Sequence, residues 1–279
     1  MSVVNSVLRP LFDLIQAPLA GLPPMVGIVL WSIPVGIFAL LVFKWTSNQE
    51  AIAEVKRRIH GSLFEIRLFN DDLRAILRAQ GRILRDVARY QLLALKPMIF
   101  ILPPLVLVMV HLHQYYGFRP LHPADEVLLE VVLADAAVGA ARPDIELDLP
   151  AGLETTTPAV WSPAIGTVAW RLAAREAGSY EVGVKLGAEV VTKTVAVSDR
   201  VLRLSPERPP STFVDQLEWP SEPPVPDGSA IRAILLAYPE GGVSLGGWAW
   251  EWSFAWMVVF FVLTMVVAVA LRKPLGVEL

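Results

Sequence analysis

The sequence predicts an integral membrane α-helical protein, with three transmembrane helices and a cytoplasmic helical hairpin, that carries an inserted all-β, immunoglobulin-like sandwich domain. Three observations predict this fold class. Of the 279 residues, 54% are hydrophobic and only 18% are charged, which is more apolar than an average soluble domain. Three stretches are apolar enough to cross a bilayer. Between the last two of them, short runs of residues alternate between apolar and polar as strands do.

The three predicted spans each have about the 20 mostly apolar residues that a bilayer requires. Residues 25–44 form the first, which has no charge before Lys44. Residues 93–115 form the second, which several prolines interrupt, and residues 250–271 form the third. The segment that precedes them, residues 1–24, predicts an amphipathic helix that lies on the membrane surface.

Charge predicts the orientation of these spans. Between Lys44 and Lys96 there are eleven Lys or Arg residues against six Asp or Glu, and such basic loops stay in the cytoplasm. The tail, residues 272–279, begins with two basic residues and belongs on the same side. We therefore expect a multi-pass protein of the cytoplasmic (inner) membrane, with its N-terminus outside and its C-terminus in the cytoplasm. Tryptophans are expected to form an interface belt: Trp45, Trp248, Trp250, Trp252 and Trp256.

Residues 46–92 predict the cytoplasmic helical hairpin. Ser47 is the expected N-cap of its first arm, because Glu50 follows three residues later. The predicted hairpin tip, Asn70 with Asp71 and Asp72, would cap the second arm. A single helix lying along the membrane surface is the alternative. Apolar residues recur with helical spacing through both arms: Ile52, Val55, Ile59, Ile66, Phe69, Leu73, Ile76, Ile83 and Val87.

The second arm is rich in arginine, which predicts a cytoplasmic docking surface formed by Arg74, Arg78, Arg82 and Arg85. One interpretation is a solvated face attracted to anionic lipid headgroups. The other is a surface that docks a ribosome, nascent chains or a partner's cytoplasmic domain. No aromatic residues are interleaved as in RNA-binding motifs, and a net charge of −3 gives no argument for binding DNA.

Residues 120–247 predict the extracytoplasmic β-sandwich domain. The runs 127–131 and 145–149 alternate cleanly, and residues 178–197 predict a hairpin that turns at Gly187. Residues 205–228 are rich in proline and predict an extended connector. The domain is expected to act either as a rigid spacer or as a surface for protein contact.

The sequence offers little for catalysis. It contains no cysteine and none of the common nucleotide-binding or hydrolase motifs. His111, His113 and His122 could form a metal site with Asp125 or Glu126, but polar anchoring at the membrane interface is the expected role. No carboxylate lies well inside a span, as proton-coupled transport would require. We therefore expect no enzyme, no metal and no cofactor.

Two segments carry a resemblance to a known family. The stretch "LRPLFDLIQAPLAGLPPMVGIVLWSIPVGIFALLVFKWTSNQEAIAEVK", residues 8–56, and the hairpin tip "LFNDDLRAIL", residues 68–77, resemble the YidC-type membrane insertase superfamily, in particular its three-span, N-out branch. The resemblance implies a membrane-integral insertase or chaperone that assists other membrane proteins. The chain departs from the family because its first span holds no positive charge and because more than a hundred residues separate its last two spans.

Two hypotheses about function follow. In the first, an insertase-like protein uses kinked spans to thin or hydrate the bilayer along an intramembrane path, for which the candidate residues are Ser32, Pro34, Pro103 and Pro104. In the second, a non-catalytic subunit stabilises a larger membrane complex through its outer β-domain and its transmembrane helices.

Overall fold

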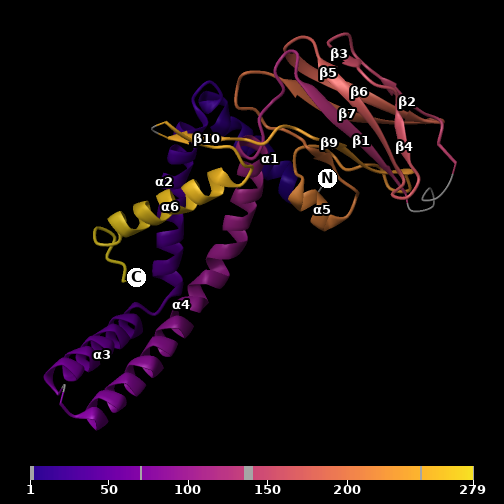
Figure 1. Cartoon of the computed structure of the whole chain (residues 1–279). Helices are drawn as coiled ribbons and strands as arrows, with labels where there is room; N and C mark the ends of the chain where they lie inside the picture. The colour runs from indigo at the N-terminus through magenta and orange to yellow at the C-terminus, as the bar shows by residue number, and fades with distance from the viewer. Residues whose placement is uncertain (1–2, 70, 135–140, 246, 279) are drawn as a thin grey trace. The chain divides into compact units, whose positions relative to one another are not determined.

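The computed structural model describes residues 3–69, 71–134, 141–245 and 247–278 of the chain (Figure 1). It is a mixed fold of helices and antiparallel sheets. The chain divides into two compact units, one of residues 1–28 with 107–258 and the other of residues 29–106 with 259–279. The helices are α1 (Val3–Gln16), the short 3-10 helix η1 (Ala17–Leu19), α2 (Pro24–Thr46), α3 (Gln49–Leu68), α4 (Leu73–Tyr116), α5 (Phe213–Glu218) and α6 (Ala255–Leu271).

Two of these helices, α2 and α4, are long and apolar enough to cross a membrane. Helix α2 has 23 residues and α4 has 44, so α4 continues well beyond the predicted second span. The third predicted span was expected to start at residue 250, but its helix, α6, starts at Ala255 and has 17 residues. The tryptophan-rich residues before it form strand β11 (Trp248–Trp250), which pairs with β10 (Val243–Leu245) around Gly247, a residue with φ of 90°.

The β-domain contains two antiparallel sheets, as the alternating sequence predicts. One has the strand order β3-β5-β1-β9-β8, with β4 also paired to β5, and the other has the order β2-β6-β7. The predicted hairpin at Gly187 is β6–β7. The strands are β1 (Glu126–Leu133), β2 (Ile145–Asp148), β3 (Leu153–Thr155), β4 (Val160–Ser162), β5 (Thr167–Ala174), β6 (Gly178–Leu186), β7 (Glu189–Val197), β8 (Glu207–Arg208) and β9 (Ile231–Leu236).

The two sheets share one hydrophobic core. Val131 and Ile234 come from the larger sheet, whereas Val182 and Val195 come from the smaller one, and all four are fully buried in the same cluster. Alternate residues of each strand point into this cluster, because successive side chains of a strand lie on opposite faces. The predicted alternation of residues 127–131 is confirmed in β1, where Val127, Leu129 and Val131 are buried.

A buried lysine interrupts this apolar face. Lys193 lies between Val191 and Val195 on the inward face of β7, and its side chain is completely buried. Its Nζ lies 2.6 Å from Glu222 Oε2 and 2.9 Å from Ser205 Oγ. The backbone N–H of Thr194 donates to the other oxygen of Glu222. A charge can be buried in a core only when it is paired and hydrogen-bonded in this way.

The pair with Lys193 holds the proline-rich connector against the sheet. Ser205 and Glu222 both belong to residues 205–228, which were predicted to be extended. The connector includes the extended strand β8, but it is not extended throughout, because Phe213–Glu218 form helix α5. Thr212 caps α5 by accepting a hydrogen bond from the N–H of Asp215 at 3.3 Å.

Replacing Lys193 with methionine should destabilise the β-domain by about 3–5 kcal/mol, because Glu222 would be left buried without its cation. The measurement is chemical denaturation of the full chain in detergent, followed by near-ultraviolet circular dichroism. The double variant K193M/E222L should recover most of the loss, since it removes both charges. Equal destabilisation in the single and double variants would contradict the prediction.

Acid should weaken the same pair. Burial alone raises the pKa of Glu222, but the charge of Lys193 and the hydrogen bonds from Lys193, Ser205 and Thr194 outweigh it and hold this pKa below its usual value of 4.5. A carboxylate with a lowered pKa in the folded state stabilises the fold above its unfolded pKa, and this contribution is lost as the pH falls through the folded pKa. The β-domain should therefore lose stability below about pH 4.5. In Glu222→Gln this component of the pH profile should disappear, and an unchanged profile would exclude Glu222 as its source.

Candidate functional site

The candidate site is the hairpin formed by α3 and the first part of α4, residues 49–95. The structure has two helical arms at this place rather than one continuous helix. The cap of α3 lies one residue beyond the predicted Ser47, because the side chain of Asn48 accepts from the N–H of Ala51 at 3.0 Å. At the tip, Asp72 Oδ1 accepts from the N–H groups of Arg74 and Ala75. Asn70 lies outside the described residues.

Both arms of the hairpin carry buried side chains. Ile52 and Val55 of α3 are buried, and so are Ser62 and, on α4, Ala79. Three residues of the predicted apolar repeat are not among them, since Phe69, Leu73 and Val87 are exposed. Phe69 and Leu73 lie at the tip, where neither arm continues and no partner helix remains to cover them.

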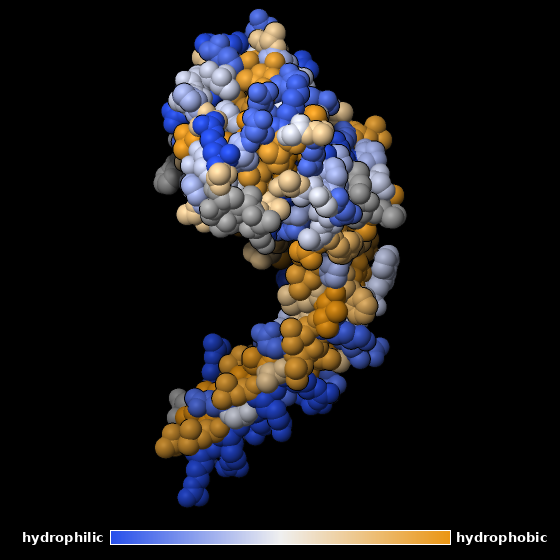
Figure 2. Space-filling view, turned by 90° about the vertical axis from the view of Figure 1, so that its right-hand side faces the viewer, coloured by the Kyte–Doolittle hydropathy of each residue, from blue (hydrophilic) through white to orange (hydrophobic). Residues whose placement is uncertain are grey.

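The outer surface of α4 is also apolar, and sequence analysis missed this. Five exposed leucines follow one another along the helix, and at about 100° per residue they fall within an arc of roughly 100°. In Figure 2 an apolar band, bordered by hydrophilic side chains, runs along the lower part of the molecule, where the hairpin lies in Figure 1. We call this set the leucine stripe: Leu73, Leu77, Leu84, Leu92 and Leu95.

Arginines run beside the leucine stripe. Each of Arg74, Arg78 and Arg85 directly follows a leucine of the stripe, so helical geometry turns it by about 100° to the neighbouring face. These three of the four predicted docking residues are exposed. The fourth, Arg82, is paired with Glu65 of α3 and so joins the two arms. The signal in the sequence is the repeated Leu-Arg dipeptide at helical spacing.

The leucine stripe lies on the same side of α4 as the exposed residues in the apolar part of this helix. Ile99, Leu102 and Val106 are exposed, and in an unbroken helix they fall in the same arc as the stripe. Pro97, Pro103 and Pro104 lie within this stretch. Because proline has no N–H, the carbonyl groups four residues before each of them lack their usual helical donor. One face of α4 is thus apolar over most of its length, and of the three freed carbonyl groups only that of Ile99, four residues before Pro103, lies on this face.

The predicted intramembrane residues do not share one surface. Ser32 is buried in α2, whereas Pro34 and Pro103 are exposed and Pro104 is half-buried. Helix α2 packs tightly on α6 at Gly36, where an added Cβ would lie 3.0 Å from the carbonyl oxygen of Thr264. Ser32 therefore lies one turn from a close helix contact.

The tryptophans of the predicted interface belt have different environments. Trp45, Trp250 and Trp252 are exposed, but Trp256 is fully buried. The indole N–H of Trp256 donates to His113 Nδ1 at 3.3 Å, which fixes this ring inside the protein. The side chain of Trp248 lies outside the described part of the chain.

The histidines that could have formed a metal site have separate partners. His111 stacks on Phe12 and contacts Arg203, and His113 contacts Trp256. His122 lies 3.4 Å from Asp199. Among the residues that the structure describes, no three His, Cys, Asp or Glu side chains come together as a group that could hold a metal ion.

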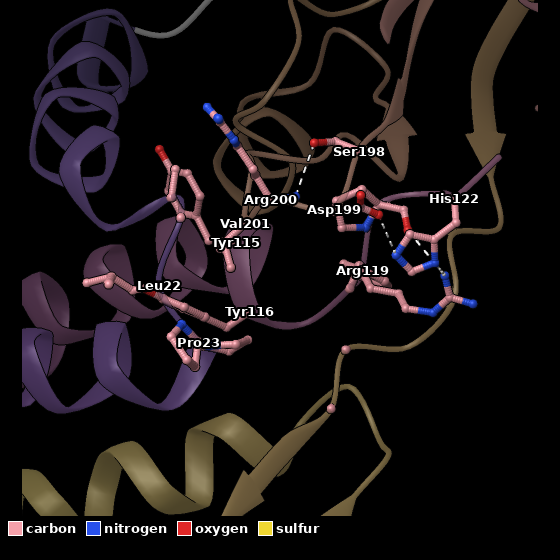
Figure 3. Close-up of a pocket in the computed structure, with 17 residues that line it drawn as sticks. Leu22, Pro23, Tyr115, Tyr116, Arg119, His122, Ser198, Asp199, Arg200 and Val201 are labelled. Atoms are coloured by element: carbon pink, nitrogen blue, oxygen red, sulfur yellow. Dashed lines mark hydrogen bonds and ion pairs between the residues drawn. The ribbon is translucent and has the colours of Figure 1, made fainter. Parts of the chain in front are cut away.

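A cavity of about 420 Å³ opens next to His122 (Figure 3). Its charged side chains mostly pair with one another. Arg119 donates to Asp125 at 2.7 Å, and His122 lies between Arg119 and Asp199, whereas Arg200 points away from this group. The charges at this cavity do not converge on a common point.

The structure thus defines a mixed helical and β protein with two helices that are long and apolar enough to cross a membrane. Comparison with protein-family models, curated proteins and solved structures gave no match to this chain.

Replacing Gly36 with valine should destabilise the contact between α2 and α6 by about 1–3 kcal/mol, because the added side chain would overpack it. Gly61→Ala is the matched control, since an added Cβ at Gly61 would meet nothing within 4 Å and should stabilise α3 by about 0.5–1 kcal/mol. Thermal unfolding in detergent measures both. Equal effects of the two substitutions would contradict the packing assignment.

Proposed function

We propose that this chain is a membrane-integral insertase or chaperone-like protein that assists the insertion or assembly of other membrane proteins. The observation that carries the proposal is the leucine stripe with its arginine border, in phase with the exposed face of the apolar part of α4. The resemblance of residues 8–56 and 68–77 to the YidC-type superfamily supports it. In this proposal α2, α4 and α6 are all spans, the N-terminus is outside and the hairpin is in the cytoplasm.

The leucine stripe suits an apolar segment of a client protein. Each Å² of apolar surface that such a segment exposes to water costs about 25 cal/mol of free energy. A row of exposed leucines can cover part of that surface, and large exposed apolar patches commonly mark interaction sites. Because the stripe continues in phase into the apolar part of α4, a client on the hairpin could reach the bilayer along a single helix face.

The prolines of α4 could help a client segment to move from the hairpin into the bilayer. A charged side chain at the bilayer centre costs about 2.5–3.5 kcal/mol on insertion scales. The carbonyl group of Ile99, which lacks its helical donor because of Pro103, offers a polar partner on the exposed face. It would lower the cost of moving a weakly polar client segment past this point. The family's positive charge inside the first span is absent here, so any polar path would depend on such backbone groups.

A structural subunit of a larger membrane complex is the second candidate. The exposed tryptophans Trp45, Trp250 and Trp252 and the β-domain favour it, because both offer broad contact surfaces. A subunit of this kind would meet one constant partner, whereas an insertase would meet many clients for a short time.

Site-specific photo-crosslinking in living cells tests the proposal. Crosslinkers at Leu77 and Pro104 should capture many short-lived nascent membrane proteins, and a crosslinker at the buried Ala79 should capture none of them. One constant partner at both Leu77 and Pro104 would refute the insertase and support the structural subunit.

Charged substitutions in the stripe add a functional readout. The double variant L77E/L84E should reduce client insertion at least fivefold, because it removes apolar surface from the stripe. Gln80→Glu is the control, as it adds a negative charge at an exposed polar residue between these leucines. Insertion is measured by protease protection of newly made membrane proteins. Equal losses in both variants would show that charge, and not the apolar surface, matters.

A further inference from the structure

The outer face of the larger sheet carries a groove of about 260 Å³ that belongs to none of the sites described above. Leu128 of β1 and Leu235 of β9 form its floor. Phe118 and Trp219 line it with aromatic rings whose centroids lie 6.4 Å apart. All of these residues belong to one compact unit of the chain.

Two glutamates flank the floor of this groove. Glu130 of β1 is the register partner of Leu235, and Leu235 is in turn the partner of Glu207 on β8. Residues in register on adjacent strands point to the same face. Since neighbouring strands lie about 4.8 Å apart, the two glutamates stand roughly 10 Å from each other, on opposite sides of the leucine.

The two carboxylates are free to bind a ligand. Within the described part of the chain, neither side chain makes a hydrogen bond or an ion pair. Burial raises the pKa of Glu207, and the nearby carboxylates of Asp215 and Glu218 raise it further, although Lys193 and Arg232 act in the opposite direction. The carboxylates of Glu130, Glu207, Asp215 and Glu218 therefore give the groove a negative potential, which Lys193 and Arg232 offset in part.

We propose that this groove binds a basic side chain, arginine or lysine, of a polypeptide segment. The methylene stem of such a side chain would pack on Leu128 and Leu235, as stems of long cationic side chains do on apolar surfaces. Its charged head would lie near the rings of Trp219 and Phe118, where a cation is attracted to the aromatic face. Glu130 and Glu207 would accept its hydrogen bonds.

The acidic surroundings favour a polypeptide over a lipid headgroup. The amine of phosphatidylethanolamine and the ammonium group of phosphatidylcholine each stand next to a phosphate. That phosphate would be repelled by Glu130, Glu207, Asp215 and Glu218. An arginine or lysine side chain brings a positive charge without a neighbouring negative one. This inference is independent of the proposed insertase function.

The test uses the full chain in detergent, labelled with 5-fluorotryptophan and observed by fluorine NMR. Trp219→Phe identifies the Trp219 signal among those of the nine tryptophans. The probe is a blocked pentapeptide, Ala-Ala-Arg-Ala-Ala, and the matched control replaces its arginine with uncharged citrulline. The arginine peptide should shift the Trp219 signal in a saturable way, with at least tenfold higher affinity than the citrulline peptide. Raising the salt concentration from 50 to 300 mM should weaken the binding.

Substitutions locate the binding to the groove. Glu130→Gln and Glu207→Gln should each reduce the affinity at least fivefold, whereas Glu146→Gln, at an exposed glutamate of the smaller sheet, should leave it unchanged. The other tryptophan signals show whether each variant is folded, and the citrulline comparison needs no variant at all. Equal binding of both peptides, or unchanged affinity in both groove variants, would overturn the proposal. A Trp219 shift with phosphatidylethanolamine vesicles but not with the arginine peptide would overturn it in favour of a lipid.

Discussion

The pair of Lys193 and Glu222 is the interaction on which the arrangement of the β-domain depends. It fixes the connector at two points, Ser205 and Glu222. The chain between these points forms β8, α5 and Trp219, so the edge of the larger sheet and one wall of its groove are held by a charge inside the core. Replacing the pair with apolar residues could keep the fold stable, whereas the native pair joins Ser205 and Glu222 of the connector to one position on β7. The acidic groove therefore depends on the pairing that allows Lys193 to be buried in the core.

The hairpin differs from the β-domain, because its helix α4 has two apolar faces. One face of α4 contains the buried Ala79 and is linked to α3 by the pair of Arg82 and Glu65. The other face carries the leucine stripe, which no described residue covers to any large extent. A soluble two-helix hairpin gains nothing from such a second apolar face, because exposed leucines cost solubility and add no packing. The leucine stripe is therefore an exposed apolar surface of the kind that commonly marks an interaction site.

The sequence predicted an element most accurately where its apolar residues recur regularly and only one of its faces is buried. Strand β1 and the β6–β7 hairpin were predicted because alternation has one explanation, a sheet with one buried face. The connector was predicted less well, because prolines indicated extension while Thr212, a local cap, allowed a short helix. Lys193 could have been found from its place between Val191 and Val195 in an alternating strand. The groove could not have been, since Glu130, Leu235 and Glu207 come together only through the strand order β1-β9-β8.

The hairpin shows why the helix period alone was not sufficient. The predicted apolar repeat included only Leu73 of the leucine stripe, and the other four leucines were left among the charged residues. Two apolar faces on one helix produce two overlapping repeats, and a search for one repeat finds only the stronger. Their relative phase is fixed because α4 is unbroken from Leu73 to Tyr116. An insertion of one residue between Leu95 and Ile99 would turn the stripe by about 100° away from the exposed face of the apolar part of α4. The continuity of this helix is therefore what joins the hairpin surface and the apolar face into one surface.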